Sequence, residues 1–107
     1  MAEEIAESFV TLEVGRPTMM RFDKYAWQAR QVLDPELGFT KTIKALVFHV
    51  IELDGLPADT IFSLVSQRAR KEIESYLVGD RFRLYRFTYI KEGPGFTPPR
   101  IMSAEPI

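Results

Sequence analysis

Aromatic and basic side chains that could contact a ligand are concentrated in two segments of this 107-residue chain. In the first segment, Tyr25, Trp27 and Arg30 lie within six residues, in a stretch that shows no apolar period. In the second segment, Phe96 lies in a loop rich in glycine and proline, where a core residue is not expected. Aromatic rings stack on planar groups, and arginine or lysine pairs with phosphate. Both segments therefore predict ligand contacts.

The aromatic residues also allow a purely structural interpretation. Trp27 either stacks on a ligand or closes one end of the core. The stripe Tyr85, Phe87 and Tyr89 has a period of two residues, which is typical of the core face of a strand. We therefore assign this stripe to the core and only Tyr89, the member nearest to the loop, to a binding site.

Few residues suit catalysis. Without cysteine there is no thiolate nucleophile, no disulfide and no sulfur-bound zinc. The single histidine, His49, lies between apolar neighbours, so we expect a satisfied core or face histidine and no metal ligand. The chain also has no serine elbow and no phosphate-binding glycine loop, and its acidic pairs fall in turns, where aspartate is common. We expect no enzyme, no cofactor and no metal.

Composition places the chain among ordinary globular domains, with 46% hydrophobic and 27% charged residues. We expect one domain over residues 9–107, preceded by an acidic tail, residues 1–8. The tail lacks the basic residues of a leader, and the apolar run from Ala45 to Leu53 is too short to span a bilayer. A cytoplasmic protein with no membrane contact is expected.

The net charge and the asparagine content limit the kinds of protein that this chain could be. The formal net charge is −1, which argues against a protein that binds duplex DNA mainly by electrostatics. The first 59 residues hold six basic and ten acidic side chains, and the remainder holds eight and five. The chain contains no asparagine, a composition associated with thermophiles.

The hydrophobic pattern predicts one helix among several strands. Ser66 is a suitable N-cap for this helix. Ala69 and Ile73 start an apolar stripe with helical spacing, and Gly79 follows the last turn. A turn at Asp54-Gly55 is expected to continue into a loop longer than two residues. The expected elements are one bent strand or two short strands over 9–14 and 18–25, a long loop over 26–40, strands over 41–53 and 60–65, a helix over 66–78, a strand over 81–91, a loop over 92–99 and a strand over 100–104.

This order resembles the OB-fold, a five-stranded Greek-key barrel with its helix between the third and fourth strands. The resemblance covers about residues 9 to 104. It rests on element order and on local features: the Asp54-Gly55 hairpin, the step from strand to helix over 62–71, and Gly79-Asp80 before the fourth strand. It implies an all-β fold with one helix. In texture the chain is most similar to small single-stranded DNA-binding proteins of replication and repair.

The resemblance implies that oligonucleotides bind across the second and third strands, between the loops 26–40 and 92–99. Bases would stack on aromatic rings and phosphates would meet cations. We therefore expect non-enzymatic binding of single-stranded nucleic acid, DNA rather than RNA, with little sequence preference. The expected site residues are Tyr25, Trp27, Arg30, Lys41, Lys44, Phe48, Tyr89, Lys91, Phe96 and Arg100.

Two alternatives remain open. The chain could be a protein-interaction module, a subunit of a larger complex or a homo-oligomer, because fold does not fix function. The strands could also belong to a different small barrel or α+β fold with another strand order. The helix cations Arg68, Arg70 and Lys71 are expected on a solvated face.

Overall fold

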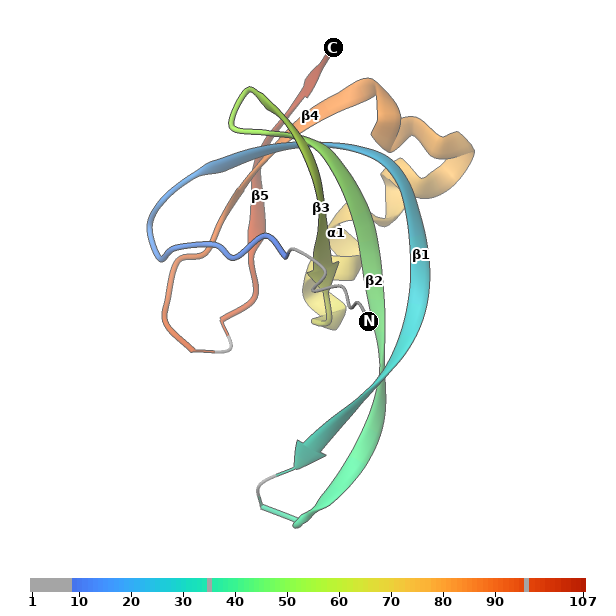
Figure 1. The fold of residues 1–107 in the computed structure, drawn as a ribbon, viewed down its shortest axis with the longest axis vertical. Coiled ribbons are helices and arrows are strands. Elements are labelled where there is room, and N and C mark those ends of the chain that lie inside the picture. The colour runs from blue at the N-terminus through green and yellow to red at the C-terminus, as the bar shows by residue number, and fades with distance from the viewer. Residues whose placement is uncertain (1–8, 35, 96) are drawn as a thin grey trace, which may run out of the picture.

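The computed structural model describes residues 9–34, 36–95 and 97–107, without the side chains of Arg30, Val32 and Asp34. The predicted acidic tail and Phe96 lie outside these residues. The elements are β1 (Thr18–Asp34), β2 (Phe39–Leu53), β3 (Leu56–Leu64), α1 (Gln67–Leu77), the 3₁₀ segment η1 (Val78–Leu84), β4 (Tyr85–Ile90) and β5 (Arg100–Pro106). The strands form one antiparallel sheet in the order β3-β2-β1-β4-β5 (Figure 1). The prediction of an all-β fold with one helix is confirmed.

The sheet is not closed into a barrel, so that part of the expectation is wrong. No ladder joins β3 to β5 over the residues described. The edge of β3 is instead met by residues 9–15, which we call the N-terminal strap. Val10 N donates to the carbonyl of Ile61 at 2.9 Å, and Gly15 N donates to the carbonyl of Lys91 at 2.8 Å. The predicted strand over 9–14 thus makes isolated parallel bridges that connect β3 to the end of β4.

The predicted loop over 26–40 is a β-ribbon. β1 and β2 stay paired from Met20–Leu53 to Asp34–Phe39, whereas β3 reaches β2 only from Leu46 onward. Beyond that point, residues 28–34 and 39–45 project from the body of the sheet, and we call them the arm (Figure 1). Most of the arm is exposed on both faces. Its sequence therefore lacks the alternation of apolar and polar residues that identifies a half-buried strand.

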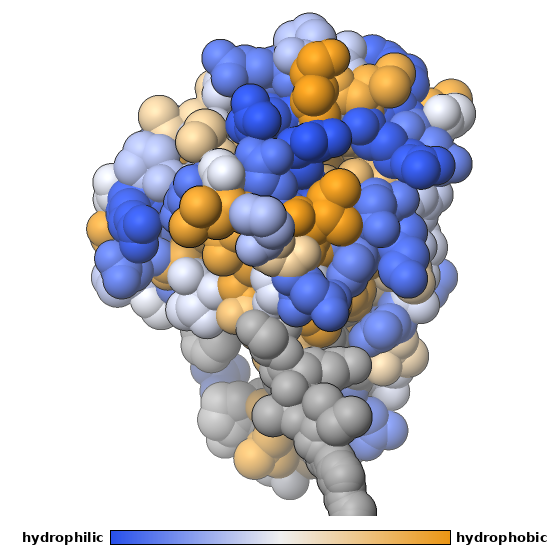
Figure 2. All heavy atoms as spheres, turned by 45° about the horizontal axis from the view of Figure 1, so that its top comes forward, coloured by the Kyte–Doolittle hydropathy of each residue, from blue (hydrophilic) through white to orange (hydrophobic). Residues whose placement is uncertain are grey.

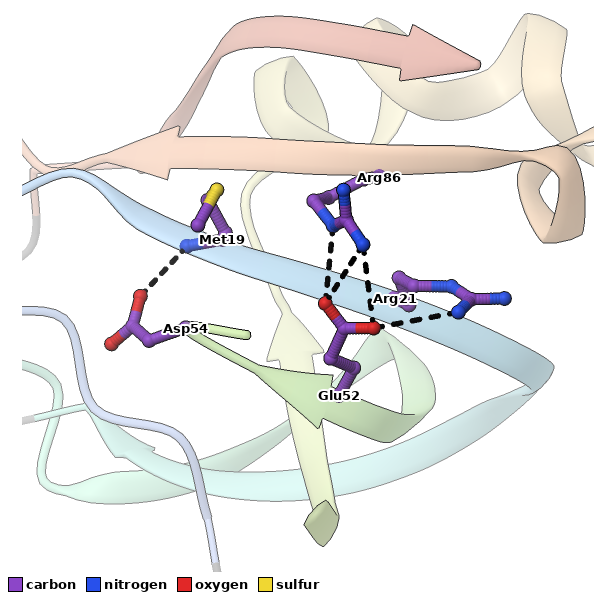
Figure 3. A network of polar contacts seen from close by, with 5 residues as sticks. All are labelled: Met19, Arg21, Glu52, Asp54 and Arg86. Carbon is purple, nitrogen blue, oxygen red and sulfur yellow. Dashed lines mark hydrogen bonds and ion pairs between the residues drawn. The ribbon is translucent and has the colours of Figure 1, made fainter. Parts of the chain in front are cut away.

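The turn between β2 and β3 is shorter than expected. Asp54 and Gly55 have φ values of 51° and 85°, as a two-residue type I′ hairpin requires. Leu56 already pairs with Leu53, so no longer loop follows. The Asp54 carboxylate also accepts a hydrogen bond from Met19 N at 3.1 Å, which ties the turn to β1 (Figure 3).

The predicted helix is confirmed, with Ser66 as its N-cap accepting from Ala69 N at 3.4 Å. The strand expected over 81–91 begins later, at Tyr85. Gly79 and Asp80 adopt left-handed φ values of 65° and 54° and form a kink within η1, so η1 occupies the residues up to Leu84 and the strand begins only after it.

The core is aromatic and lies between the sheet, α1 and η1. Phe22 is at its centre, with its ring centroid 4.4 Å from that of Phe48 and 5.6 Å from that of Phe87. Phe87 and Tyr89 are fully buried and Tyr85 packs against the cluster, so the assignment of this stripe to the core is confirmed. Burial of so many rings provides most of the driving force for folding.

The outer face of the sheet carries a charged ladder across three strands. The carboxylate of Glu52 on β2 accepts from Arg21 Nη1 at 3.4 Å and from Arg86 Nε at 3.1 Å (Figure 3). All three side chains are partly buried. The ladder therefore stabilises the alignment of β2, β1 and β4.

Candidate nucleic-acid interface

Trp27 is the exposed aromatic residue at which predicted binding residues come together. It lies on β1 opposite Leu46, at the base of the arm, and is 50% exposed. Two residues earlier, Tyr25 packs into the core, 5.4 Å from Phe82 and 5.9 Å from Phe48 between ring centroids. Because residues two apart share a face of a strand, Trp27 continues the core-facing row just beyond the edge of the core.

The guanidinium group of Arg70 covers one side of the indole. Its Cζ atom is 5.8 Å from the centroid of the Trp27 ring, within the range of a cation–π contact. Arg70 Nη1 also donates to the backbone carbonyl of Lys44 at 3.1 Å. We call Trp27, Lys44 and Arg70 the indole patch.

The charges of the indole patch are not neutralised by carboxylates. Arg16, Arg21, Arg86 and Arg100 each pair with an acidic side chain, whereas no ion pair within the described ranges engages Arg70. The Lys44 side chain is exposed. Lys44 lies opposite Ala29 in the ladder, and Ala29 shares a face with Trp27. An aromatic surface and two available cations therefore lie on the same side of the ribbon.

The sheet register explains why the helix reaches the indole. Trp27 pairs with Leu46, and Leu46 pairs with Leu64 on β3. α1 begins three residues after Leu64, so its first turn lies at the end of this row. Arg70 was expected on a solvated face and was not among the predicted site residues. Arg70 comes near Trp27 only because of the register in which β1, β2 and β3 pair. The hydrophobic period of a single segment does not show that register.

Two predicted stacking residues are not accessible. Phe48 and Tyr89 are both 0% exposed and belong to the core cluster. Neither ring can stack on a base without opening the core, so both assignments are wrong for this conformation. Burial removes the Tyr89 hydroxyl from water and raises its pKa, and the hydroxyl has no hydrogen-bond partner in the described structure.

The predicted cations of β2 lie on opposite faces. Lys41 and Lys44 are both exposed, but three residues separate them. Residues an odd number apart on a strand point to opposite sides, so Lys44 shares the face of Trp27 and Lys41 does not. Arg30 is paired with Ile43 in the backbone ladder, and its side chain lies outside the described part of the structure.

The second predicted group is separate from the indole patch. Lys91 lies at the end of β4 and, with Thr97 and Pro99, lines a hollow of about 220 Å³ beside the N-terminal strap. Arg100 begins β5, and its Nε and Nη2 donate to the Glu92 carboxylate at 2.6 and 2.8 Å. Hydrogen bonds from Arg100 lower the pKa of Glu92. Arg100 is thus already paired with a carboxylate.

The outer face of β2 and β3, which the resemblance implies as the binding face, is occupied by a histidine and two carboxylates. His49 Nδ1 lies 2.7 Å from Asp23 Oδ1, and His49 Nε2 lies 2.7 Å from Asp59 Oδ1. These bonds, Asp59 first, raise the pKa of His49. The expectation of a satisfied face histidine is confirmed. His49 and Val47 also line a shallow hollow of about 190 Å³, and the carboxylates beside it disfavour phosphate.

The arm carries an exposed ring that the prediction did not include. Phe39, at the distal end of the arm, is 57% exposed. Phe39 falls within the loop expected over 26–40 and was not among the predicted site residues, and neither was Phe9, which is 50% exposed. The only available signal for Phe39 was its position directly after Gly38, whose φ of 73° is typical of a turn.

Within residues 9–34, 36–95 and 97–107, no group of three or more histidine or acidic side chains could hold a metal ion. Neither helical segment in the described residues is long and apolar enough to cross a membrane. No protein-family model, curated protein or solved structure matches the chain significantly.

Proposed function

We propose that this protein is a non-enzymatic module of OB-fold type that binds single-stranded nucleic acid at the indole patch, and that this nucleic acid is DNA rather than RNA. The observation that carries the proposal is the half-exposed ring of Trp27 beside two cations, Arg70 and Lys44, that form no ion pair with a carboxylate among the residues that the structure describes. The position of α1 between β3 and β4 supports the family assignment.

In this proposal a base stacks on the exposed side of the indole, while Arg70 and Lys44 contact the flanking phosphates. Stacking on one aromatic side chain contributes about 1–3 kcal/mol per base and accepts any base, so little sequence preference follows. We further propose a cytoplasmic role where replication or repair exposes single strands. The absence of asparagine supports a protein that works at high temperature.

The fluorescence of Trp27 tests the proposal directly, because the chain has no other tryptophan. We expect an oligothymidine of roughly ten nucleotides, within the usual site size, to quench this fluorescence at low salt. Replacing Trp27→Ala should weaken binding of a dye-labelled oligothymidine by about 5- to 150-fold in fluorescence anisotropy, because the stacking energy is lost.

Salt dependence tests the cations separately. We expect Arg70→Gln to reduce the slope of log affinity against log salt by about 0.7, the value for one phosphate contact on a single strand. Lys71→Gln is the matched control, since it removes an exposed cation at the next position of α1 and should leave the slope unchanged. Absence of both quenching and binding at low salt would rule out the proposed function.

A second candidate function is binding of another protein through the arm. The observation that favours it is the exposure of large apolar side chains at the distal end of the arm and in its turn, where Leu33, Phe39 and the turn residue Leu37 are each more than half exposed. Exposed apolar groups on a projecting element are typical of interaction sites.

A further inference from the structure

The two edge strands of the arm, β1 and β2, differ in how far they are protected against pairing with a further strand. Among the described residues, no third strand adjoins β1 beyond Met20 through a ladder or β2 before Leu46. The edge of β2 carries Lys41 and Lys44, and lysines on an edge disfavour pairing with another strand. From Gln28 to Asp34 the edge of β1 carries one basic and one acidic residue, Arg30 and Asp34, and has no proline or glycine, so its net charge is zero, whereas the two lysines give the β2 edge a net charge of +2. The edge of β1 is therefore open to strand pairing.

The arm is also the part of the fold with the least internal support. A two-stranded ribbon without a third strand is only marginally stable in water, and Leu33 on β1 is 62% exposed. At the opposite end of the molecule, apolar areas are small and separated by hydrophilic residues (Figure 2). Strand pairing along β1 would give the arm the third and fourth strands it lacks.

We propose that the β1 edges of two copies of this chain pair antiparallel about a twofold axis and form a four-stranded ribbon. The open stretch from Gln28 to Asp34 is centred on Gln31, so Gln31 would face Gln31 of the second copy. In this register Ala29 lies opposite Leu33 and Arg30 lies opposite Val32. No two like charges lie directly opposite each other, so the pairing avoids the destabilising repulsion that opposed like charges cause across strands.

A second copy suits this edge better than an unlimited stack of chains. Pairing β1 with β1 uses the open edge of both copies at once, as in a closed twofold assembly. The outer edges of the resulting ribbon are the two β2 strands, each carrying Lys41 and Lys44. These lysines disfavour addition of a further strand, so assembly stops at the dimer.

Sedimentation equilibrium of the full chain without nucleic acid tests the proposal. We expect a concentration-dependent monomer–dimer equilibrium. Gln31→Lys would place two ammonium groups directly opposite each other and should weaken the dimer about tenfold or more. Thr42→Lys is the matched control, because Thr42 is exposed and lies opposite Gln31 within the arm, on β2, and this change should leave the dimer intact.

Cysteine cross-linking tests the register, since the natural chain has no cysteine. Gln31→Cys should form a covalent dimer under mild oxidation, and Thr42→Cys should not. Far-UV circular dichroism would show that each variant is folded. A wild-type chain that stays monomeric, a Gln31→Lys variant that dimerises normally, or equal cross-linking of the two cysteine variants would overturn the proposal. Since no nucleic acid is present, none of these results bears on the indole patch.

Discussion

Tyr89 contains a buried polar atom that the core does not satisfy. Its ring packs 4.9 Å from that of Phe62, between centroids, and its hydroxyl has no partner within the described structure. A buried hydroxyl without a hydrogen bond costs about 1–3 kcal/mol relative to a bonded one. The aromatic ring, not the hydroxyl, is therefore what stabilises the fold at this position.

We predict that Tyr89→Phe raises the free energy of unfolding by about 1 kcal/mol, because it removes the unsatisfied hydroxyl and keeps the ring. Urea unfolding followed by circular dichroism would measure the change. Tyr85→Phe, at a half-buried position on the same strand, serves as the control and should change the free energy of unfolding little. A destabilised Tyr89→Phe variant would show that the hydroxyl has a partner.

At the residue scale, the sequence identified suitable side chains but not their accessibility. Phe48 lies in a strand whose two faces are both largely apolar, so the sequence could not show which face α1 and η1 would cover. Trp27 was ambiguous for a related reason, because its exposure depends on where the core ends along β1. The exposed side chain of Trp27 and the burial of Phe48 follow from the packing of elements distant in sequence.

At the element scale, local signals were sufficient for α1 and insufficient for the arm. The cap at Ser66 and the stripe through Ala69 and Ile73 are contained within the helix itself, so they could be read from a short window. The arm has no buried face beyond Ala45, and its pairing depends on the partner strand. A periodicity search therefore has nothing to detect there.

His49 connects three strands, since it lies on β2 and contacts Asp23 on β1 and Asp59 on β3. Its pKa is raised in the folded state. The charged form therefore adds stability below the unfolded pKa of about 6.5, and this contribution is lost as the pH rises through the raised folded value.

We predict that His49→Gln lowers the free energy of unfolding by about 1 kcal/mol at about pH 5.5 and has little effect at about pH 9. The figure is small because Asp59 is largely exposed, and solvent screens such pairs. Urea unfolding at the two pH values would measure it. Asp59→Asn should reduce the same pH dependence, whereas a His49→Gln effect that is equal at both pH values would contradict the role of charge.

At the scale of the whole molecule, the N-terminal strap links the two halves of the open sheet. Val10 and Leu12 pack against the core, and the backbone of the strap bonds to Ile61 and Lys91. The sequence left other strand orders open, and the barrel closure that the resemblance implied is absent from the described sheet. The contact between the strap and the edge of β3 joins segments about fifty residues apart, so no periodic pattern in either segment predicts it.

We predict that Val10→Pro lowers the free energy of unfolding by about 1 kcal/mol more than Val10→Ala does. Both variants lose side-chain packing, but only proline removes the N–H that donates to Ile61. Thermal or urea unfolding of the pair isolates the backbone bond. Equal stability of the two variants would mean that the bond contributes nothing to holding the strap.

The two halves of the long hairpin formed by β1 and β2 are expected to open in different ways. The inner half shares the aromatic cluster and opens only when the entire domain does, whereas the outer half can fray and re-form while that cluster stays intact. We therefore expect the amides of the outer half to exchange hydrogen with solvent faster than those of the inner half. We also expect substitutions at the exposed Leu33 and Phe39 to change what the hairpin can contact and to have little effect on whether the chain folds.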